Sequence, residues 1–272
     1  MKIYHGIAPI IENEPVAEQL WRLRLEAEKI AEWALPGQFL MLRIPGQHTP
    51  LLGRPLAIYN IVGAFVDVIY AVVGTGTALL AEQRAGMSLE VWGPLGNGWL
   101  KATETGAVPE TPILVAGGIG QTPMRLLAEH FLKGTSQPVH LLMGSRDLAH
   151  LACVEDFQQL SANFANRLKV QIATDDGSFG HAGFVTDLLP QFSSSPAPHL
   201  YACGPQPMLK RVAAFAAEQN FPCHVSLETP MACGMGICFT CVVRCQADND
   251  DGWDYCRTCV EGPIFDAAKM IW

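Results

Sequence analysis

The first hundred residues alternate between apolar and polar positions with the period of a β-strand. Trp21, Leu23 and Leu25 alternate with charged neighbours, the pattern of a strand with one buried face. Further runs rich in Val, Ile, Phe and Tyr are separated by Pro-Gly or Gly turns. These runs predict strands at 38–44, 56–61, 65–73 and 88–92. Short strands at this spacing indicate a small antiparallel β-barrel.

Beyond a polar, Pro-containing stretch at 101–112, expected to be a linker, strands alternate with helices. Apolar runs predict strands at 113–116, 139–143, 168–173, 199–203 and 224–227. Helical spacing predicts helices between them, at 122–132, 154–160, 184–189 and 207–219. Such an alternation predicts a parallel α/β sheet, so we expect a barrel domain followed by an α/β domain.

Composition narrows the class of protein. The chain has 272 residues, a net charge of −8 and 16% charged residues, where about a quarter is usual. Disorder is excluded as the main state, and the acidic balance argues against a nucleic-acid surface. Because a membrane span needs about 20 consecutive apolar residues, none is expected, and the start lacks the pattern of a cleaved signal peptide.

The nine cysteines are unevenly placed. Six of them crowd into the last 42 residues: Cys233, Cys238, Cys241, Cys245, Cys256 and Cys259. An odd total without a secretion signal favours metal binding in a reducing compartment over disulfides. We expect Cys153 and Cys223 to be small buried hydrophobes.

Cys233, Cys238 and Cys241 form the pattern C-x4-C-x2-C. This is the plant-type spacing for three thiolate ligands of a [2Fe–2S] cluster, which needs a fourth cysteine further on. Gly234 and Gly236 let the backbone curl around a cluster and offer N–H groups to its sulfurs.

The fourth ligand must be Cys245, Cys256 or Cys259. Cys245 follows Cys241 too soon to return easily from the far side of a cluster. Cys256 and Cys259 form a C-x2-C pair of their own, so a zinc site is the alternative. The Gly-rich x4 spacing favours iron–sulfur over zinc.

A glycine-rich segment follows the first predicted α/β strand. It comprises Gly117, Gly118, Gly120, Thr122 and Pro123, and it opens a helix for which Thr122 suits the N-cap and Pro123 the first helical position. Such a turn lets a diphosphate face a helix N-terminus. It is not a G-x-G-x-x-G fingerprint, and a plain tight turn is the alternative.

Other candidate ligand-binding positions follow strands or begin one. Cys203, Gly204 and Pro205 end a predicted strand, at the sheet edge where α/β proteins bind ligands. Arg54 begins an otherwise apolar strand, where a cofactor pyrophosphate is a suitable anionic partner, although a lone Arg is usually a solvated surface group. Gly76 and Thr77 precede a helix-like segment and form a second anion cradle or an N-cap.

Together these motifs resemble the ferredoxin-reductase family. The tail narrows the resemblance: Met231 to Cys241, followed by Cys259-Val-Glu-Gly-Pro-Ile-Phe265, is similar to the electron-transfer subunits of NAD-dependent dihydroorotate dehydrogenase. Residues 93–98, Gly-Pro-Leu-Gly-Asn-Gly, carry the same resemblance. It covers nearly the whole chain and implies one FAD, one [2Fe–2S] cluster and docking on a flavin-containing (FMN) catalytic subunit.

The resemblance also assigns residues. It implies domains at 1–105 for FAD, 106–228 for NAD and 229–272 for the cluster. Flavin contacts would come from Arg54, Pro55, Leu56, Ala57, Ile69, Tyr70, Ala71, Gly76 and Thr77. NAD would lie near Gly117, Gly118, Gly120, Thr122, Pro123, Cys203, Gly204 and Pro205. The cluster ligands would be Cys233, Cys238, Cys241 and Cys259, so the resemblance selects Cys259 over Cys256.

Two positions depart from the family, which usually has Ser where Ala57 stands and Arg where Ala71 stands. We expect FAD to bind nonetheless, less tightly or with an altered potential. The implied activity is an electron relay from dihydroorotate, oxidised on a partner, through the cluster and FAD to NAD⁺ in pyrimidine biosynthesis. No side chain need act as acid or base, so no catalytic residue is assigned. A cytoplasmic hetero-oligomer is expected, with neither nucleic acid nor membrane as a partner.

Two alternatives remain at this stage. One is a reductase subunit of a hydrogenase or a ferredoxin:NAD(P) oxidoreductase, and the other is a zinc-stabilised interaction module without activity. Ser145 and Arg146 follow the second α/β strand, where a cation could bind the 2′-phosphate of NADP. The resemblance favours NAD.

Overall fold

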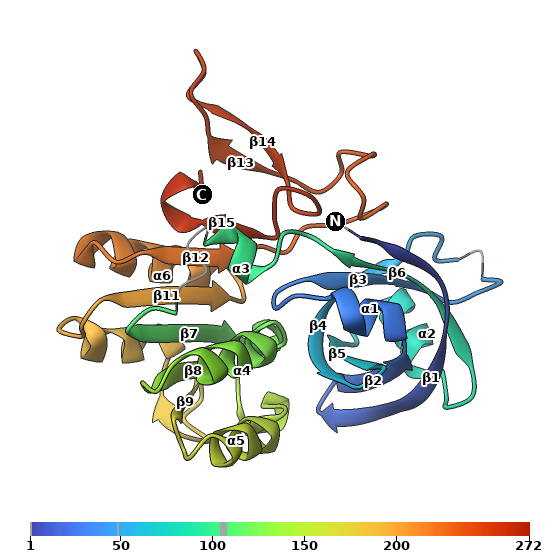
Figure 1. Cartoon of the computed structure of the whole chain (residues 1–272), viewed down its shortest axis with the longest axis horizontal. Helices are drawn as coiled ribbons and strands as arrows, with labels where there is room; N and C mark the ends of the chain where they lie inside the picture. Colours follow the sequence, from blue (N-terminus) through green and yellow to red (C-terminus); the bar gives the residue numbers. More distant parts are fainter. Residues whose placement is uncertain (1, 48, 104–107) are drawn as a thin grey trace.

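The N-terminal half of the chain folds into a closed antiparallel barrel (Figure 1). The computed structural model describes residues 2–47, 49–103 and 108–272. The barrel strands follow one another around the wall in the order β1-β2-β5-β4-β3-β6. Their bounds are β1 Tyr4–Ala17, β2 Leu20–Glu26, β3 Phe39–Arg43, β4 Arg54–Val62, β5 Phe65–Ala71 and β6 Ser88–Leu95. The predicted antiparallel barrel is confirmed.

The positions of the buried side chains explain which barrel strands were predicted from the sequence. Leu23 and Leu25 of β2 are fully buried, as their alternation predicts. The sequence pattern did not predict strand β1. Of its fourteen residues only Ala8 and Ile10 are buried, so the strand shows almost no alternation of apolar and polar positions. Two short helices complete the barrel, α1 (Glu28–Trp33), also not predicted, and α2 (Thr75–Ala81).

The second half forms a sheet in the order β10-β9-β8-β7-β11-β12-β15. The parallel strands are β7 Thr111–Gly117, β8 Val139–Ser145, β9 Leu168–Thr174, β10 His181–Ala182, β11 Pro198–Cys203 and β12 Cys223–Ser226. Strand β15 (Ile264–Asp266) pairs antiparallel with β12. The expected parallel sheet is therefore present, with one antiparallel edge strand that the sequence pattern did not indicate.

Helices cover both faces of this sheet, because neighbouring strand residues point to opposite sides. Leu114 and Ala116 pack with one core, under α4 (Met124–Gly134) and α5 (Val154–Asn163). Ile113 and Val115 pack with the other, under α6 (Gln206–Gln219) and the 3₁₀ helix η3 (Val185–Phe192). The remaining short helices are α3 Trp99–Ala102, η1 Gly118–Gln121, η2 Leu148–His150 and η4 Ala267–Lys269.

The expected linker is shorter than 101–112, because Lys101 and Ala102 belong to α3 and Thr111 begins β7. The predicted domain boundary at 105 lies outside the described residues. Trp99 closes the gap between the two halves: it is fully buried, and its indole N–H donates to the Pro123 carbonyl at 3.3 Å. None of the helices in the described ranges is long and apolar enough to cross a membrane.

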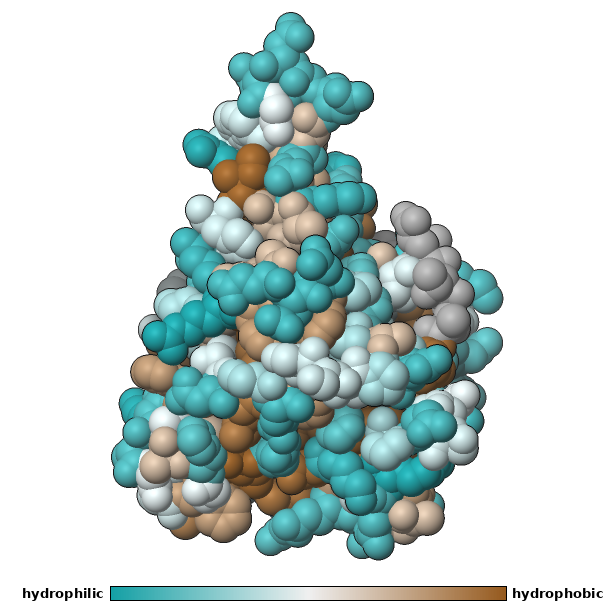
Figure 2. Space-filling model, turned by 90° about the vertical axis from the view of Figure 1, so that its left-hand side faces the viewer, coloured by the Kyte–Doolittle hydropathy of each residue, from teal (hydrophilic) through white to brown (hydrophobic). Residues whose placement is uncertain are grey.

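The cysteine-rich tail is more structured than its sequence suggests. After β12 it crosses the top of the molecule in Figure 1, forms the hairpin β13 (Val242–Gln246) and β14 (Trp253–Arg257), and returns as β15. The hairpin stands out as a narrow, mostly hydrophilic projection in Figure 2. The tail therefore contacts both halves of the protein.

Candidate functional site

A cavity of about 490 Å³ lies between the barrel and the end of the sheet, a size typical of small-molecule sites. One wall comes from β4, β5 and α2, and the other from the loop after β7, the end of β11 and the segment after β12. Predicted site residues line it: Arg54, Pro55, Leu56, Ala57, Ile69, Tyr70, Ala71, Thr77, Thr122, Pro123 and Cys203. The structure thus brings most of the predicted flavin residues and part of the predicted NAD residues to one cavity.

Arg54 is the one cation that lines this cavity among the residues the structure describes. It donates to the carbonyls of Leu52 and Gly53 at 3.1 and 3.2 Å. Gly76 lies outside the cavity lining but directly against Arg54, since a Cβ there would come within 2.5 Å of its Nη2. The Thr77 hydroxyl is engaged in capping, because it accepts the N–H groups of Val73 and Gly74.

Ala57 and Ala71 both line the cavity, so the two departures from the family pattern fall where a flavin would contact the wall. The methyl groups there supply neither a hydroxyl nor a second cation. Within the described lining, Arg54 is therefore the side chain that could bind an anion by its charge.

The two predicted glycine loops pack against each other at the carboxyl edge of the sheet. A Cβ on Gly120 would collide with the Cys203 carbonyl, and a Cβ on Gly204 would lie 3.0 Å from the Gly117 backbone. These glycines are therefore required by loop packing as well as by any ligand. Gly118 differs, because its Cβ would meet open space.

The predicted capping role of Thr122 is wrong. Helix α4 begins one residue later, with Pro123 as its N-cap. The Thr122 hydroxyl instead donates to the Ile119 carbonyl at 2.5 Å, closing the 3₁₀ turn η1. The Thr122 hydroxyl is therefore already bonded within the turn that precedes the helix.

A smaller hollow beside this loop is lined by Gly118, Gln121, Ser145 and His150, among others. The buried side-chain oxygen of Gln121 has no hydrogen-bond partner within the described part of the chain. A buried acceptor without a partner costs stability, so a ligand hydroxyl would satisfy it. Arg146, the candidate 2′-phosphate contact, is mostly exposed and lies 3.5 Å from Asp147.

Sequence reasoning missed the segment after β12, which also lines the cavity. Ser226 and Cys203 both line it, and burial raises the pKa of the Cys203 thiol while Ser226 opposes this effect. Burial also raises the pKa of the Glu228 carboxyl. A charged residue directly after an apolar strand was the signal that could have identified Glu228.

The structure places the four predicted cluster cysteines in two pairs. The sulfurs of Cys241 and Cys259 lie 3.1 Å apart, and the side chains of Cys233 and Cys238 are hydrogen-bonded to each other. Nowhere in the described ranges do three His, Cys, Asp or Glu side chains converge as around a single metal ion. Two pairs match the ligand arrangement of a [2Fe–2S] cluster, in which each of the two irons is bound by two thiolates.

Local hydrogen bonds favour the thiolate form that metal ligands need. The side chain and backbone of Thr240 bond to the Cys238 sulfur and lower the pKa of that thiol to about 6. The Met235 N–H donates to the Cys233 sulfur at 3.4 Å. Burial, with Cys241 adjacent, raises the pKa of Cys259 to about 12, and a bound metal would favour its thiolate form.

The cysteine loop is fixed against the barrel. The Trp92 indole N–H donates to the Cys233 carbonyl at 2.9 Å. Gly234 has a positive φ of 71°, and a Cβ there would lie 2.7 Å from Met41. Cys241 and Cys259 pack with Phe39, Met41 and Leu95 of the barrel, and Phe39 also lines the cavity. The cluster site and the cavity therefore share a wall.

Cys245 and Cys256 lie elsewhere, in the hairpin. They pack with Phe265 and Met270 in the core under α6. Cys223 is buried in the same core, as expected. Cys153 is only partly buried and accepts a hydrogen bond from Arg22 at 3.6 Å, so the expectation of a simple hydrophobe is wrong for it.

Comparison with known proteins gives consistent matches. Residues 114–214 match the oxidoreductase NAD-binding domain, and residues 228–271 match the iron–sulfur cluster binding domain of dihydroorotate dehydrogenase B. The chain is 36% identical over 274 residues to the dihydroorotate dehydrogenase B (NAD⁺) electron transfer subunit of Shouchella clausii, covering all of both chains. It is 37% identical to the corresponding subunit of a Geobacillus species, covering 96% of each.

Among solved structures, the fold is similar to a chain of the NADH-dependent reduced ferredoxin-NADP oxidoreductase, described for flavin-based electron bifurcation. The TM-score is 0.82 at 24% identity, covering 98% of this chain and 90% of the other. At this level of identity, the similarity shows a shared fold.

Proposed function

Because the chain belongs to the family of electron-transfer subunits of dihydroorotate dehydrogenase B, we propose that it relays electrons from a dihydroorotate-oxidising partner to NAD⁺. Its cofactors are one [2Fe–2S] cluster and one FAD, with NAD⁺ as the terminal acceptor. When bound, the flavin exchanges single electrons with the cluster and a hydride with the nicotinamide.

The observation that carries this proposal is the shared wall between the cysteine pairs and the cavity. Phe39 packs with Cys241 and Cys259 on one side and lines the cavity on the other. This arrangement supports an electron path between two redox groups that stays inside the protein, away from water.

The chain's own residues bind and orient the groups. Arg54 would bind the pyrophosphate of FAD through its guanidinium fork, beside Gly76, whose lack of a side chain leaves room for the fork. Ile69 and Tyr70 of β5 would contact the flavin from the cavity wall, together with Pro55, Leu56, Ala57, Ala71 and Thr77. Cys233, Cys238, Cys241 and Cys259 would bind the cluster.

NAD⁺ would bind across the carboxyl edge of the sheet. Gly118 leaves open space beside the buried Gln121 oxygen, and Thr122, Pro123 and Cys203 face the cavity from the same edge. Gly117, Gly120, Gly204 and Pro205 shape the two loops that hold these residues in place.

The partner is proposed to be a dihydroorotate dehydrogenase catalytic subunit that carries its own flavin (FMN). Three long apolar side chains of the cysteine loop are exposed: Met235 by 46%, Ile237 by 76% and Phe239 by 60%. Apolar side chains on a loop that holds cluster ligands suit a protein interface that brings the partner close to the cluster. A cytoplasmic location agrees with the free thiols in the tail.

The test uses the chain expressed with and without the catalytic subunit. The loaded chain is expected to show flavin absorbance, a rhombic electron paramagnetic resonance signal on reduction, and reduction by NADH in preference to NADPH. The complex is expected to reduce NAD⁺ with dihydroorotate. A chain that binds zinc and no flavin, or a catalytic subunit that does not co-purify with it, would refute the proposal.

A further inference from the structure

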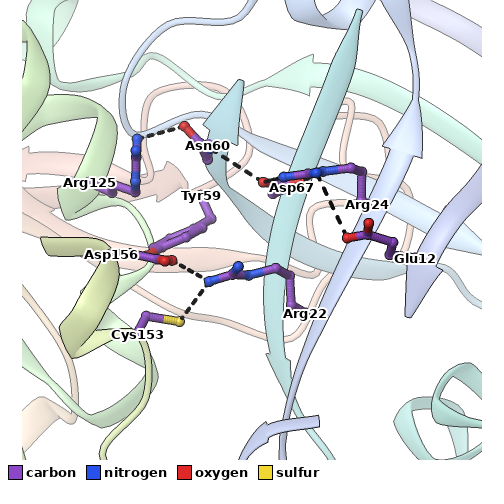
Figure 3. Close-up of polar contacts among 9 residues, drawn as sticks. All are labelled: Glu12, Arg22, Arg24, Tyr59, Asn60, Asp67, Arg125, Cys153 and Asp156. Atoms are coloured by element: carbon purple, nitrogen blue, oxygen red, sulfur yellow. Dashed lines mark hydrogen bonds and ion pairs between the residues drawn. The ribbon is translucent and has the colours of Figure 1, made fainter. Parts of the chain in front are cut away.

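A polar network joins the barrel to the α/β half (Figure 3). We define the interdomain clasp as Arg22, Tyr59 and Asn60 of the barrel together with Arg125 and Asp156 of the α/β half. The Asp156 carboxylate accepts from the Tyr59 hydroxyl at 2.7 Å and from the Arg22 guanidinium. Arg125 donates to the Asn60 side-chain oxygen at 2.6 Å.

Tyr59 is the centre of the clasp. Its side chain is 1% exposed, and its ring lies between two cations, 5.7 Å from Arg22 and 5.8 Å from Arg125. Cation–π contacts of this kind are worth more when they are shielded from water. The network continues into the barrel, where Asn60 donates to the buried Asp67, which also accepts two bonds from Arg24.

The clasp joins β4 to α4, and both lie next to residues that line the cavity. Tyr59 follows Ala57 on β4 by two residues, and Arg125 follows Pro123 by two residues on the first turn of α4. Any rotation between the halves that breaks these bonds therefore shifts the two cavity walls relative to each other.

The chemistry of the clasp suits orientation rather than strength. The Arg22 and Asp156 side chains are 20% and 30% exposed and lose part of their hydration, so the ion pair between them adds little net stability. The contact at Trp99 is mostly apolar: its ring meets Tyr201 edge-on at 5.8 Å, and the bond from its indole N–H to the Pro123 carbonyl is long, at 3.3 Å. Apolar contacts tolerate sliding, whereas the bonds to Asp156 fix both distance and direction.

We propose that Asp156 and Arg125 are positioning residues for hydride transfer: through Tyr59 and Asn60 they hold the nicotinamide-binding half at the angle that hydride exchange with the flavin needs. This inference rests on the proposed function. Because a misplacement of about 1 Å can slow a reaction by roughly 100-fold, loss of the clasp affects the chemical step more than nicotinamide binding.

The test measures reduction of the bound flavin by NADH and by 4-deuterated NADH in single-turnover experiments on the loaded chain. For Asp156→Ala the limiting rate is expected to fall by roughly 10- to 100-fold, with a primary isotope effect. The dissociation constant for NADH and the flavin potential should stay close to wild type. Asp156→Asn, which still accepts from Tyr59, should recover part of the rate.

Glu155→Ala is the matched control, because Glu155 is an exposed carboxylate on the same turn of α5. Tyr59→Phe removes a single oxygen and tests the same bond if Asp156→Ala does not fold. Limiting rates within about twofold of wild type in the folded clasp variants would overturn the inference, even if their melting temperatures fall. Failure of NADH to reduce the wild-type flavin would instead refute the proposed function.

Discussion

A half-buried histidine pair predicts that the fold loses stability in mild acid. His199 Nε2 and His224 Nδ1 lie 2.8 Å apart on β11 and β12, and the ring of Tyr201 stacks on His199 with centroids 4.4 Å apart. Burial lowers the pKa of His199 from 6.5 to about 4, assisted by His224 and opposed by Asp266. The folded protein therefore holds this imidazole neutral over a pH range where the unfolded chain protonates it.

The sign follows from proton linkage. With a folded pKa below the unfolded value, the stabilising effect of neutral His199 is complete above about pH 6.5 and is lost as the pH falls toward 4. One pKa unit corresponds to about 1.36 kcal/mol, so His199 accounts for a loss of about 3 kcal/mol in the free energy of unfolding by pH 4. This is a large share of the 5–15 kcal/mol that is typical of whole domains.

The assay compares urea unfolding of wild type and His199→Gln at several pH values across this range. The glutamine retains a hydrogen-bonding group but does not titrate, so the decline in unfolding free energy toward acid should be shallower. Effects of other acid-sensitive groups, including the cluster, are common to both proteins and cancel in the difference. His181→Gln, at an exposed site, is the control. Equal declines for wild type and His199→Gln would refute the reasoning.

Further predictions concern the cofactor sites. Cys259→Ser should abolish the reduced-cluster resonance signal while Cys256→Ser preserves it, and the opposite result would assign the fourth ligand to Cys256. Arg54→Ala should weaken FAD binding to the apo-chain by roughly 10- to 100-fold, because a hydrogen bond to a charged group is worth about 1.5–3 kcal/mol; an unchanged fluorescence titration would contradict this. Trp92→Phe removes the hydrogen bond to the Cys233 carbonyl, which is worth about 1 kcal/mol. The visible absorbance of the cluster should therefore bleach roughly fivefold faster when a chelator is added. An unchanged bleaching rate would show that this bond does not stabilise the cluster site.

Local patterns predicted the parts of the fold that have local causes. The alternation at Leu23 and Leu25 marks a barrel strand because both residues point into one core. The C-x4-C-x2-C spacing predicted the cysteine loop because Gly234 and Gly236 both take the positive φ that such a tight loop requires. Strand β15 could not be predicted in this way: three residues carry little periodicity, and their pairing with β12 depends on the fold around them.

The interdomain clasp and the choice among the tail cysteines could not be predicted from local patterns, because both depend on contacts between residues far apart in the sequence. Arg22 and Asp156 are 134 positions apart and meet only because the barrel packs on α5. Sequence spacing alone does not decide whether Cys256 or Cys259 is the fourth cluster ligand. The hairpin separates them, directing Cys256 toward Cys245 and leaving Cys259 beside Cys241.

The C-terminal segment also ties the two halves together. Asn97, at the end of the barrel, donates its side-chain amide to the carbonyls of Glu261 and Ile264 at 2.9 and 2.8 Å, and its backbone N–H to Gly262 at 2.7 Å. The next residues form β15, which completes the sheet at β12. The barrel and the sheet are thus bonded through the same few residues that follow Cys259. A disturbance of the segment after Cys259 should therefore alter the angle between the halves, the same angle that we propose the interdomain clasp holds.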